Sequence, residues 1–334
     1  VARKLNLAVN ASVLERAQKV IDSRKNATVM PRSTKEKTRV VLVYFCETPI
    51  TMDTLRGVHD ELKESGAMER YNIALDEKSA QGDMSMATLI ANDIVRRQYD
   101  YIITLSTPIL QVMAQENLSI PHVFGMVTDP FRMGVAKSPE DHLPQLTGVA
   151  TLQPVGRTIK VMRELLPNAK RIGIVWNTAE ACSEACTYKA RESAPQYGFE
   201  LLEANVSSAG EVLDAAKSLI ARGIDIFILS GDNTVGLATR SLAELMKRQK
   251  IPFFTNGPGD VELGAFLGLG ADYYQVGRET VRVALRVMAG ENPKNIPINA
   301  CVPETMAVSL PLADLYGIHL SDEFLSRTAV VKRE

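Results

Sequence analysis

The sequence predicts an α/β protein built from two doubly wound lobes of parallel sheet. Three observations carry this prediction. Short, nearly continuous apolar runs recur along the chain, as in strands that are buried on both faces of a parallel sheet. Segments with apolar residues at helical spacing separate these runs. The alternation of strand and helix occurs twice in succession, and 334 residues are enough for two cores.

Residues 39–150 contain the first series of strands. The helix expected over 51–65 has an apolar stripe, and Gly66 suits the position after its last turn. Asp83 is expected to cap a second helix, and a third helix begins at Thr107. The expected strands are Val40–Phe45, Tyr71–Leu75, Tyr101–Leu105, His122–Met126 and Thr147–Ala150.

The second half repeats this order. A crossing helix over 154–166 stops at Pro167, because proline breaks a helix interior. Helices over 179–197, 208–221 and 234–248 alternate with the strands. The expected strands are Arg171–Trp176, Phe199–Ala204, Asp225–Leu229, Pro252–Phe254 and Ala265–Leu267.

The chain is expected to cross between the lobes more than once. The elements after Gly264 exceed what the second lobe needs. They are a long helix over 273–288, a strand over 305–310 and a short helix over 312–316. Such crossings predict a hinge made of several chain segments.

The element order also predicts the limits of the lobes. Residues 1–38 are polar and charged, and we expect them to form an N-terminal extension and linker. The first lobe is expected to contain residues 39–150 and 271–302. The second is expected to contain residues 151–270 and 303–334.

Composition argues against several classes of protein. The net charge of −1 gives no indication of nucleic acid or an anionic membrane as a partner. No apolar stretch approaches the roughly 18–20 residues that span a bilayer. The four cysteines and four histidines lack metal-ligand spacing, so no metal site is expected. Cys182 and Cys186, four residues apart on an expected helix, are more often two reduced or buried thiols than a bridge.

The sequence contains no pattern that is typical of a catalytic site. The histidines have no companion pattern of nucleophile and base, and neither Gly-x-Gly-x-x-Gly nor Gly-Lys-Ser/Thr occurs. We therefore expect a protein that binds a small polar molecule without transforming it, and that needs no cofactor.

Two polar loops of the first half are candidate anion sites. In parallel sheets the loops at the carboxyl ends of the strands form the ligand crevice. Ser106 and Thr107 follow a strand and precede a proline, which is typical of a helix cap whose free N–H groups attract a carboxylate. Glu47 and Thr48 precede another proline in the same way. In both loops the alternative is a plain helix cap that binds nothing.

Acidic residues in two further loops are candidate ligand contacts. Asp232 stands before Asn233 and Thr234. A buried carboxylate that faces a crevice is costly unless a cation pairs with it, and an α-ammonium group would supply this cation. Alternatively, Asp232 only caps the helix that follows. Thr128 and Asp129 precede a proline, so this loop is either a contact through Thr128 or an Asp-Pro turn.

Amide and aromatic side chains complete the candidate site. Asn177 and Asn256 are expected to add amide contacts, or to serve as turn residues. Trp176 is a candidate wall for an apolar pocket, although an aromatic residue at a strand end is more often part of a core. The other aromatic candidates for such a wall are Phe45, Phe124, Tyr273 and Tyr274.

A set of short motifs is more specific in its order and spacing than any motif alone. They are Ala80-Gln81-Gly82-Asp83, Thr107-Pro108, Val127-Thr128-Asp129-Pro130, Leu146-Thr147-Gly148-Val149, Glu164-Leu165-Leu166-Pro167-Asn168-Ala169-Lys170-Arg171-Ile172-Gly173, Asp232-Asn233-Thr234-Val235, Asp272-Tyr273-Tyr274 and Gly277-Arg278. With this set the chain, over residues 39–318, resembles substrate-binding proteins of ABC importers with the type I periplasmic-binding fold. It is most similar to the branch whose known members bind aromatic amino acids such as tryptophan and phenylalanine.

The resemblance implies a fold and a function. It implies three crossings between the lobes, with the helix from Tyr273 returning to the first lobe. It also implies an exported protein, periplasmic or lipid-anchored, that delivers a small ligand, an amino acid, to an ABC permease in the membrane. The sequence departs from the family at Thr48, where relatives often carry histidine, at Thr178 and Cys182, and in residues 1–38.

A rival interpretation is the effector or sensor domain of a transcriptional regulator or receptor. The same two-lobe fold serves in regulators that also carry a DNA-binding head. Residues 3–30 faintly resemble a ribbon-helix-helix segment, but Pro31 would break the second helix that such a head requires.

Overall fold

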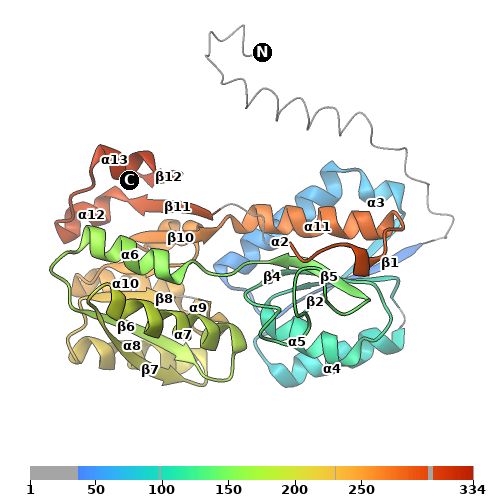
Figure 1. Ribbon diagram of the computed structural model, residues 1–334, viewed down its shortest axis with the longest axis horizontal. Coiled ribbons are helices and arrows are strands. Elements are labelled where there is room, and N and C mark those ends of the chain that lie inside the picture. Colours follow the sequence, from blue (N-terminus) through green and yellow to red (C-terminus); the bar gives the residue numbers. More distant parts are fainter. Residues whose placement is uncertain (1–36, 98, 230, 300–303, 334) are drawn as a thin grey trace, which may run out of the picture. The chain divides into compact units, whose positions relative to one another are not determined.

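The computed structural model describes residues 37–97, 99–229, 231–299 and 304–333. Most of the expected N-terminal extension, including the segment that resembles ribbon-helix-helix proteins, therefore lies outside the described residues, as does Cys301. The described chain forms two β-sheets, each covered by helices on both faces (Figure 1). This is the α/β architecture of two parallel-sheet lobes that the sequence predicts.

The first sheet is wholly parallel, with the strand order β2-β1-β3-β4-β5. Its helices are α2 (Pro49–Glu64), α3 (Ala67–Arg70), α4 (Met84–Arg97) and α5 (Thr107–Glu116). Its strands are β1 (Thr38–Tyr44), β2 (Ile73–Ser79), β3 (Tyr101–Leu105), β4 (His122–Val127) and β5 (Leu146–Ala150).

Successive residues of β1 enter different cores, because side chains alternate between the faces of a strand. Val40 and Leu42 belong to the core under α2, and Val41 and Val43 belong to the core under α4 and α5. The nearly continuous apolar run of this strand is thus the result of burial on both faces.

The second sheet has the strand order β12-β11-β10-β9-β8-β6-β7. Strand β11 runs antiparallel to β10, and the other pairs are parallel. The strands are β6 (Arg171–Asn177), β7 (Glu200–Val206), β8 (Ile226–Leu229), β9 (Phe253–Thr255), β10 (Leu267–Ala271), β11 (Glu304–Ser309) and β12 (Val330–Lys332).

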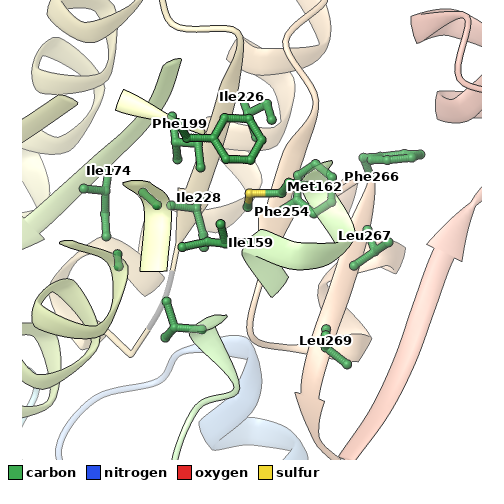
Figure 2. Packing of buried hydrophobic residues seen from close by; sticks show 14 of the residues in the cluster. Ile159, Met162, Ile174, Phe199, Ile226, Ile228, Phe254, Phe266, Leu267 and Leu269 are labelled. Atoms are coloured by element: carbon green, nitrogen blue, oxygen red, sulfur yellow. The ribbon is translucent and has the colours of Figure 1, made fainter. Parts of the chain in front are cut away.

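Helices cover both faces of this sheet as well. On one face, Ile159 and Met162 of α6 pack with Phe254 and Phe266, whose rings meet edge to face at 5.4 Å (Figure 2). The other face packs against α8 and α10. The helices are α6 (Val155–Leu165), α7 (Ala181–Gln196), the 3₁₀ turn η2 (Ala209–Glu211), α8 (Val212–Ala221), α9 (Asn233–Gly236), α10 (Thr239–Gln249), η3 (Pro258–Leu263), α12 (Leu310–Tyr316) and α13 (Asp322–Ser326).

The chain passes between the two sheets three times. The first pass joins β5 to α6, and the second joins β10 to α11 (Tyr273–Met288), which returns to the first sheet and packs along α2 (Figure 1). After α11 and η4 (Pro293–Asn295), Asn299 pairs with Val149 beside β5, and β11 then begins in the second sheet. The return of the helix from Tyr273 agrees with what the resemblance implies.

The structure corrects several sequence-based expectations. The helix expected over 234–248 is two helices, α9 and α10, interrupted after Gly236. The strand expected over 265–267 begins at Leu267 and continues to Ala271, because its backbone pairs with β11 there. Helix α13 and strand β12 were not expected. None of the described helices is long and apolar enough to cross a membrane.

Two glycines allow α11 to cross α2 at close range. A Cβ atom on Gly277 would lie 2.0 Å from the Thr54 carbonyl oxygen, and one on Gly57 would lie 2.0 Å from the Tyr274 carbonyl oxygen. Beside this crossing, the Arg278 guanidinium pairs with Glu61 at 2.6 Å. The crossing therefore attaches the returning helix to the first sheet.

We predict that Gly277→Ala lowers the free energy of unfolding by about 1–3 kcal/mol or more, because the added methyl group forces the two backbones apart. Urea denaturation followed by circular dichroism measures the change. Gly210→Ala is the matched control, since the atom nearest to its new Cβ would be the Ser208 Oγ at 3.9 Å. Equal stability of the two variants would contradict a close α2–α11 crossing.

Candidate functional site

A cavity lies between the two sheets, at the carboxyl ends of their strands. Residues of both lobes line it: Thr48, Pro49, Ile50, Ser106, Thr107, Met126, Thr128, Gln153, Cys182, Leu229, Gly231, Asp232, Asn233, Gly236, Thr239, Asn256, Asp260 and Tyr273.

Helix N-termini form the first-lobe wall of the cavity. Thr48 caps α2: its hydroxyl oxygen accepts a hydrogen bond from the Thr51 amide at 3.3 Å and also contacts the Thr51 hydroxyl. At the start of α5, the Thr107 hydroxyl accepts a hydrogen bond from the Thr128 amide at 3.2 Å. Both helices direct the positive ends of their dipoles to this wall, which favours an anionic group there.

Ser106, the residue before α5, is strained and unpaired. Its backbone has φ 88° and ψ 153°, a region that is nearly exclusive to glycine. Its side chain does not cap α5, and within the described part of the chain its buried Oγ has no hydrogen-bond partner. Strain at a cavity wall is typical of a residue that is held for binding.

The Asp232 carboxylate organises the second-lobe wall. One oxygen caps α9 by accepting a hydrogen bond from the Val235 amide at 2.7 Å. The other accepts from the Asn177 amide at 2.7 Å and from the Ser183 hydroxyl. The capping role that the sequence left as an alternative is therefore present in the structure.

A second carboxylate, Glu180, lies behind Asp232. Its oxygens accept hydrogen bonds from the backbone amides and the side chains of Asn233 and Thr234, at 2.6–3.0 Å. Burial, together with the nearby Glu180 charge, raises the pKa of Asp232. Burial also raises the pKa of the Cys182 thiol, whose Sγ donates to Glu180. Cys182 is a free, buried thiol, and Cys186 is buried as well.

Asp260 of η3 is a third buried carboxylate and lines the cavity directly. Only 3% of its surface is exposed, and its Oδ1 has no hydrogen-bond partner among the described residues. Burial raises its pKa to about 7, and the negative charge of Asp53 adds to the increase, whereas a hydrogen bond from the Thr255 side chain lowers it. The carboxylate is therefore only partly compensated by the described residues.

Amide groups hold the hydroxyl of Tyr273 at the hinge side of the cavity. The Tyr273 oxygen accepts from the Gln153 amide at 2.5 Å and from the Asn256 amide at 3.2 Å. Gln153 lies in the first chain crossing, and Tyr273 begins α11 after the second. The hinge segments thus contribute directly to the cavity wall.

The structure brings seven of the sequence-predicted site residues together around the cavity. They are Thr48, Ser106, Thr107, Thr128, Asp232, Asn233 and Asn256. The other five lie outside its lining: Glu47, Asp129, Trp176, Asn177 and Thr234.

These five residues have other contacts or are exposed. Glu47 is exposed, and Asp129 closes its own turn by accepting from the Phe131 and Arg132 amides. Trp176 belongs to the core between α6, α7 and the second sheet. Asn177 donates to the Thr234 hydroxyl at 2.9 Å and so joins the loops beneath the cavity.

Sequence reasoning missed Gln153, Glu180 and Asp260 as parts of the site. Asp260 follows a glycine–proline turn after a strand, so its position was a usable signal. Glu180 carried a similar signal, because it stands in the loop between β6 and α7. Gln153 carries no such signal, because only the chain crossing brings it to the site. Phe45 and Phe124, two candidates for an aromatic wall, are core residues, whereas Tyr273 lines the cavity.

Known proteins resemble this chain over most of its length. The family model for the ABC transporter substrate binding protein matches residues 39–332. A tyrosine-binding protein of Clostridioides difficile is 28% identical over 264 residues, which are 79% of this chain and 76% of that protein. A crystal structure of a conserved domain protein from Vibrio cholerae is 29% identical, with a TM-score of 0.82, and the match covers 88% of this chain and 99% of that one.

A further solved structure supports the fold alone. It is the ABC domain of a Streptococcus pneumoniae protein in complex with L-Trp, with 21% identity and a TM-score of 0.83. The match covers 89% of this chain and 100% of that one.

We predict that Ser106→Gly stabilises the free protein by roughly 1 kcal/mol, because glycine removes the backbone strain but loses some entropy on folding. Urea denaturation of the free protein measures the gain. Ser106→Ala is the control, since it keeps the Cβ atom and therefore the strain. If both variants had the same stability, Ser106 would not be strained.

Proposed function

Because the chain belongs to the family of ABC transporter substrate-binding proteins, we propose that it binds an α-amino acid in the interlobe cavity and presents it to a membrane permease. One observation carries the choice of ligand class. The described residues that line the cavity include two acidic residues, Asp232 and Asp260, but no lysine, arginine or histidine. A ligand with a positive group fits this lining better than a purely anionic one.

The opposite wall complements the other end of a zwitterion. The α5 N-terminus carries the positive end of a helix dipole, and the unpaired Ser106 hydroxyl is available as a donor. An α-carboxylate placed here would accept from Ser106 and from free backbone amides of α5. The ammonium group would then be directed to the acidic side of the cavity.

Part of the cavity lining is apolar and suits an apolar ligand side chain. This apolar surface consists of Ile50, Met126, Leu229 and the ring of Tyr273. An aromatic amino acid is therefore our preferred ligand, and the names of the tyrosine-binding relative and of the L-Trp complex agree with this choice. We place the protein outside the cytoplasm, where an importer collects its ligand.

Because the proposed ligand lies between two lobes, its binding includes a closing movement of the hinge. Contacts from both walls remove water from the ligand and hold the lobes together, so the permease can recognise the closed shape. One direct contact already joins the lobes outside the cavity: the Arg132 guanidinium, between β4 and β5, lies 4.9 Å from the ring centre of Tyr188 on α7. We propose that this contact favours the closed arrangement.

We predict that an aromatic amino acid raises the melting temperature of the protein and that sugars and nucleosides do not. The twenty amino acids, with glucose and adenosine as controls, can be compared by differential scanning fluorimetry. Free ligand at about 100 times its Kd adds about 2.7 kcal/mol of stability. A shift with a sugar or nucleoside, and none with an amino acid, would overturn the proposed function.

We also predict that Arg132→Ala weakens binding of the amino acid identified in that panel by about two- to fivefold, because one exposed cation–π contact is lost. Isothermal titration calorimetry measures the affinity. Arg327→Ala is the matched control, since its guanidinium lies 5.1 Å from the Phe324 ring within one lobe. Equal affinities of both variants and the wild type would exclude a role of Arg132 in closure.

A further inference from the structure

The two carboxylates that line the cavity have very different surroundings. Asp232 accepts three hydrogen bonds from its own lobe and has one residual acceptor position, since a carboxylate has about four. Those donors come from the end of β6, from α7 and from α9. Its charge is therefore largely compensated before any ligand enters.

Asp260 is compensated far less, by one hydrogen bond from the Thr255 side chain. Its residue is 97% buried, yet Oδ1 has no partner among the described residues. An unpaired buried carboxylate oxygen is costly, and each one in a native structure needs an explanation. A donor that arrives with the ligand would supply the missing partner of Oδ1.

The surrounding charges favour a cationic donor. Asp53 on α2 faces Asp260 and is negative, and the nearby Tyr273 hydroxyl on α11 is neutral. Arg56 lines a neighbouring cavity together with Asp260, but its guanidinium pairs with Asp53 at 2.9 Å. A positive group of the ligand would thus meet an excess of negative charge.

The local backbone keeps Asp260 in place. The Asp260 amide donates to the Gly257 carbonyl at 3.0 Å, and the Asp260 carbonyl accepts from the Ala265 amide at 3.1 Å. A Cβ atom on Gly257 would lie 2.7 Å from the Asp260 Oδ2 and 2.9 Å from the Ile50 side chain. The position after β9 is therefore closely packed, and the carboxylate is fixed before binding.

We propose that Asp260, rather than Asp232, directly pairs with the α-ammonium group of the ligand. This inference rests on the proposed function and specifies its substrate class: the protein selects molecules with a primary amine and rejects their deaminated analogues. Asp232 then has the separate role of holding the loop around α9.

The test compares L-tyrosine and L-tryptophan with their deaminated analogues, 3-(4-hydroxyphenyl)propionate and indole-3-propionate, by isothermal titration. The wild type should bind the amino acid about 10- to 100-fold more tightly, which is the usual effect of one hydrogen bond to a charged group. Asp260→Asn should lose this difference by weakening only the amino acid. Asp260→Ser provides a second variant in case the first does not fold.

Glu262→Gln is the matched control. Glu262 lies two residues from Asp260 on η3, and its exposed carboxylate pairs with Lys332 at 3.2 Å. This variant should retain the wild-type preference for the amine. A loss of preference in both variants would point to a general effect on η3 and overturn the inference.

The free protein provides a readout that ligand affinity does not influence. Because burial raises the pKa of Asp260 to about 7, the carboxylate is largely neutral at pH 5 and largely charged at pH 8. The stability that such a group contributes is lost as the pH rises from its unfolded pKa, about 4, to its folded pKa, about 7. Asp260→Asn should therefore raise the melting temperature more at pH 8 than at pH 5. A lower melting temperature at both values would mean that Asp260 is a structural acceptor.

The possible failures are distinguishable. If the wild type binds neither amino acid in this comparison and no other amino acid in the fluorimetry panel, the proposed function fails and the inference fails with it. If the wild type prefers the amine and Asp260→Asn keeps that preference, the function stands and the role of Asp260 is excluded. Equal affinity of the wild type for the amino acid and for its deaminated analogue would also exclude the role of Asp260.

Discussion

The burial of carboxylates without cationic side chains is the constraint on which the rest of the site depends. Taking a carboxylate out of water costs several kcal/mol in practice unless hydrogen bonds or a cation compensate it. Glu180 and Asp232 are compensated by backbone amides, hydroxyls and a side-chain amide of neighbouring loops. The short helix α9 exists in this form because its first amides point to those two acids. Asp260 has fewer such donors, and its Oδ1 has no hydrogen-bond partner among the described residues.

The arrangement of the chain explains how such a site can bind and release a ligand. Each lobe has its own sheet with a core on both faces, so each can move as a body. The walls of the cavity come from the strand ends of both sheets, and the hinge contributes Gln153 and Tyr273. A ligand in this position contacts both lobes and the segments between them. Its binding energy is thereby coupled to the relative position of the lobes.

Two residues with strained backbone conformations lie on the first-lobe wall of the cavity. Ser106 has φ 88°, and Met126, which also lines the cavity, has φ 58°. The pairing of β4 with β5 shifts in register between Phe124 and Val127, next to the strained methionine. These conformations persist because the surrounding strands are fully buried and leave the backbone no alternative path. They point the ends of β3 and β4 into the cavity.

The sequence by itself determined the two parallel-sheet lobes, since buried parallel strands require long apolar runs and surface helices require apolar stripes. The β3 strand, Tyr101–Leu105, and the α11 helix, Tyr273–Met288, have the bounds that these patterns predict. The pattern also identified seven residues of the cavity lining, because loops after parallel strands share one edge of a sheet. Only the tertiary structure decided that Trp176 belongs to a core, that Gln153 reaches the site, and that the Asp260 Oδ1 has no partner among the described residues. These outcomes depend on which elements pack together and on which hydrogen bonds form between residues far apart in the sequence. Local sequence patterns predict neither the packing nor these hydrogen bonds.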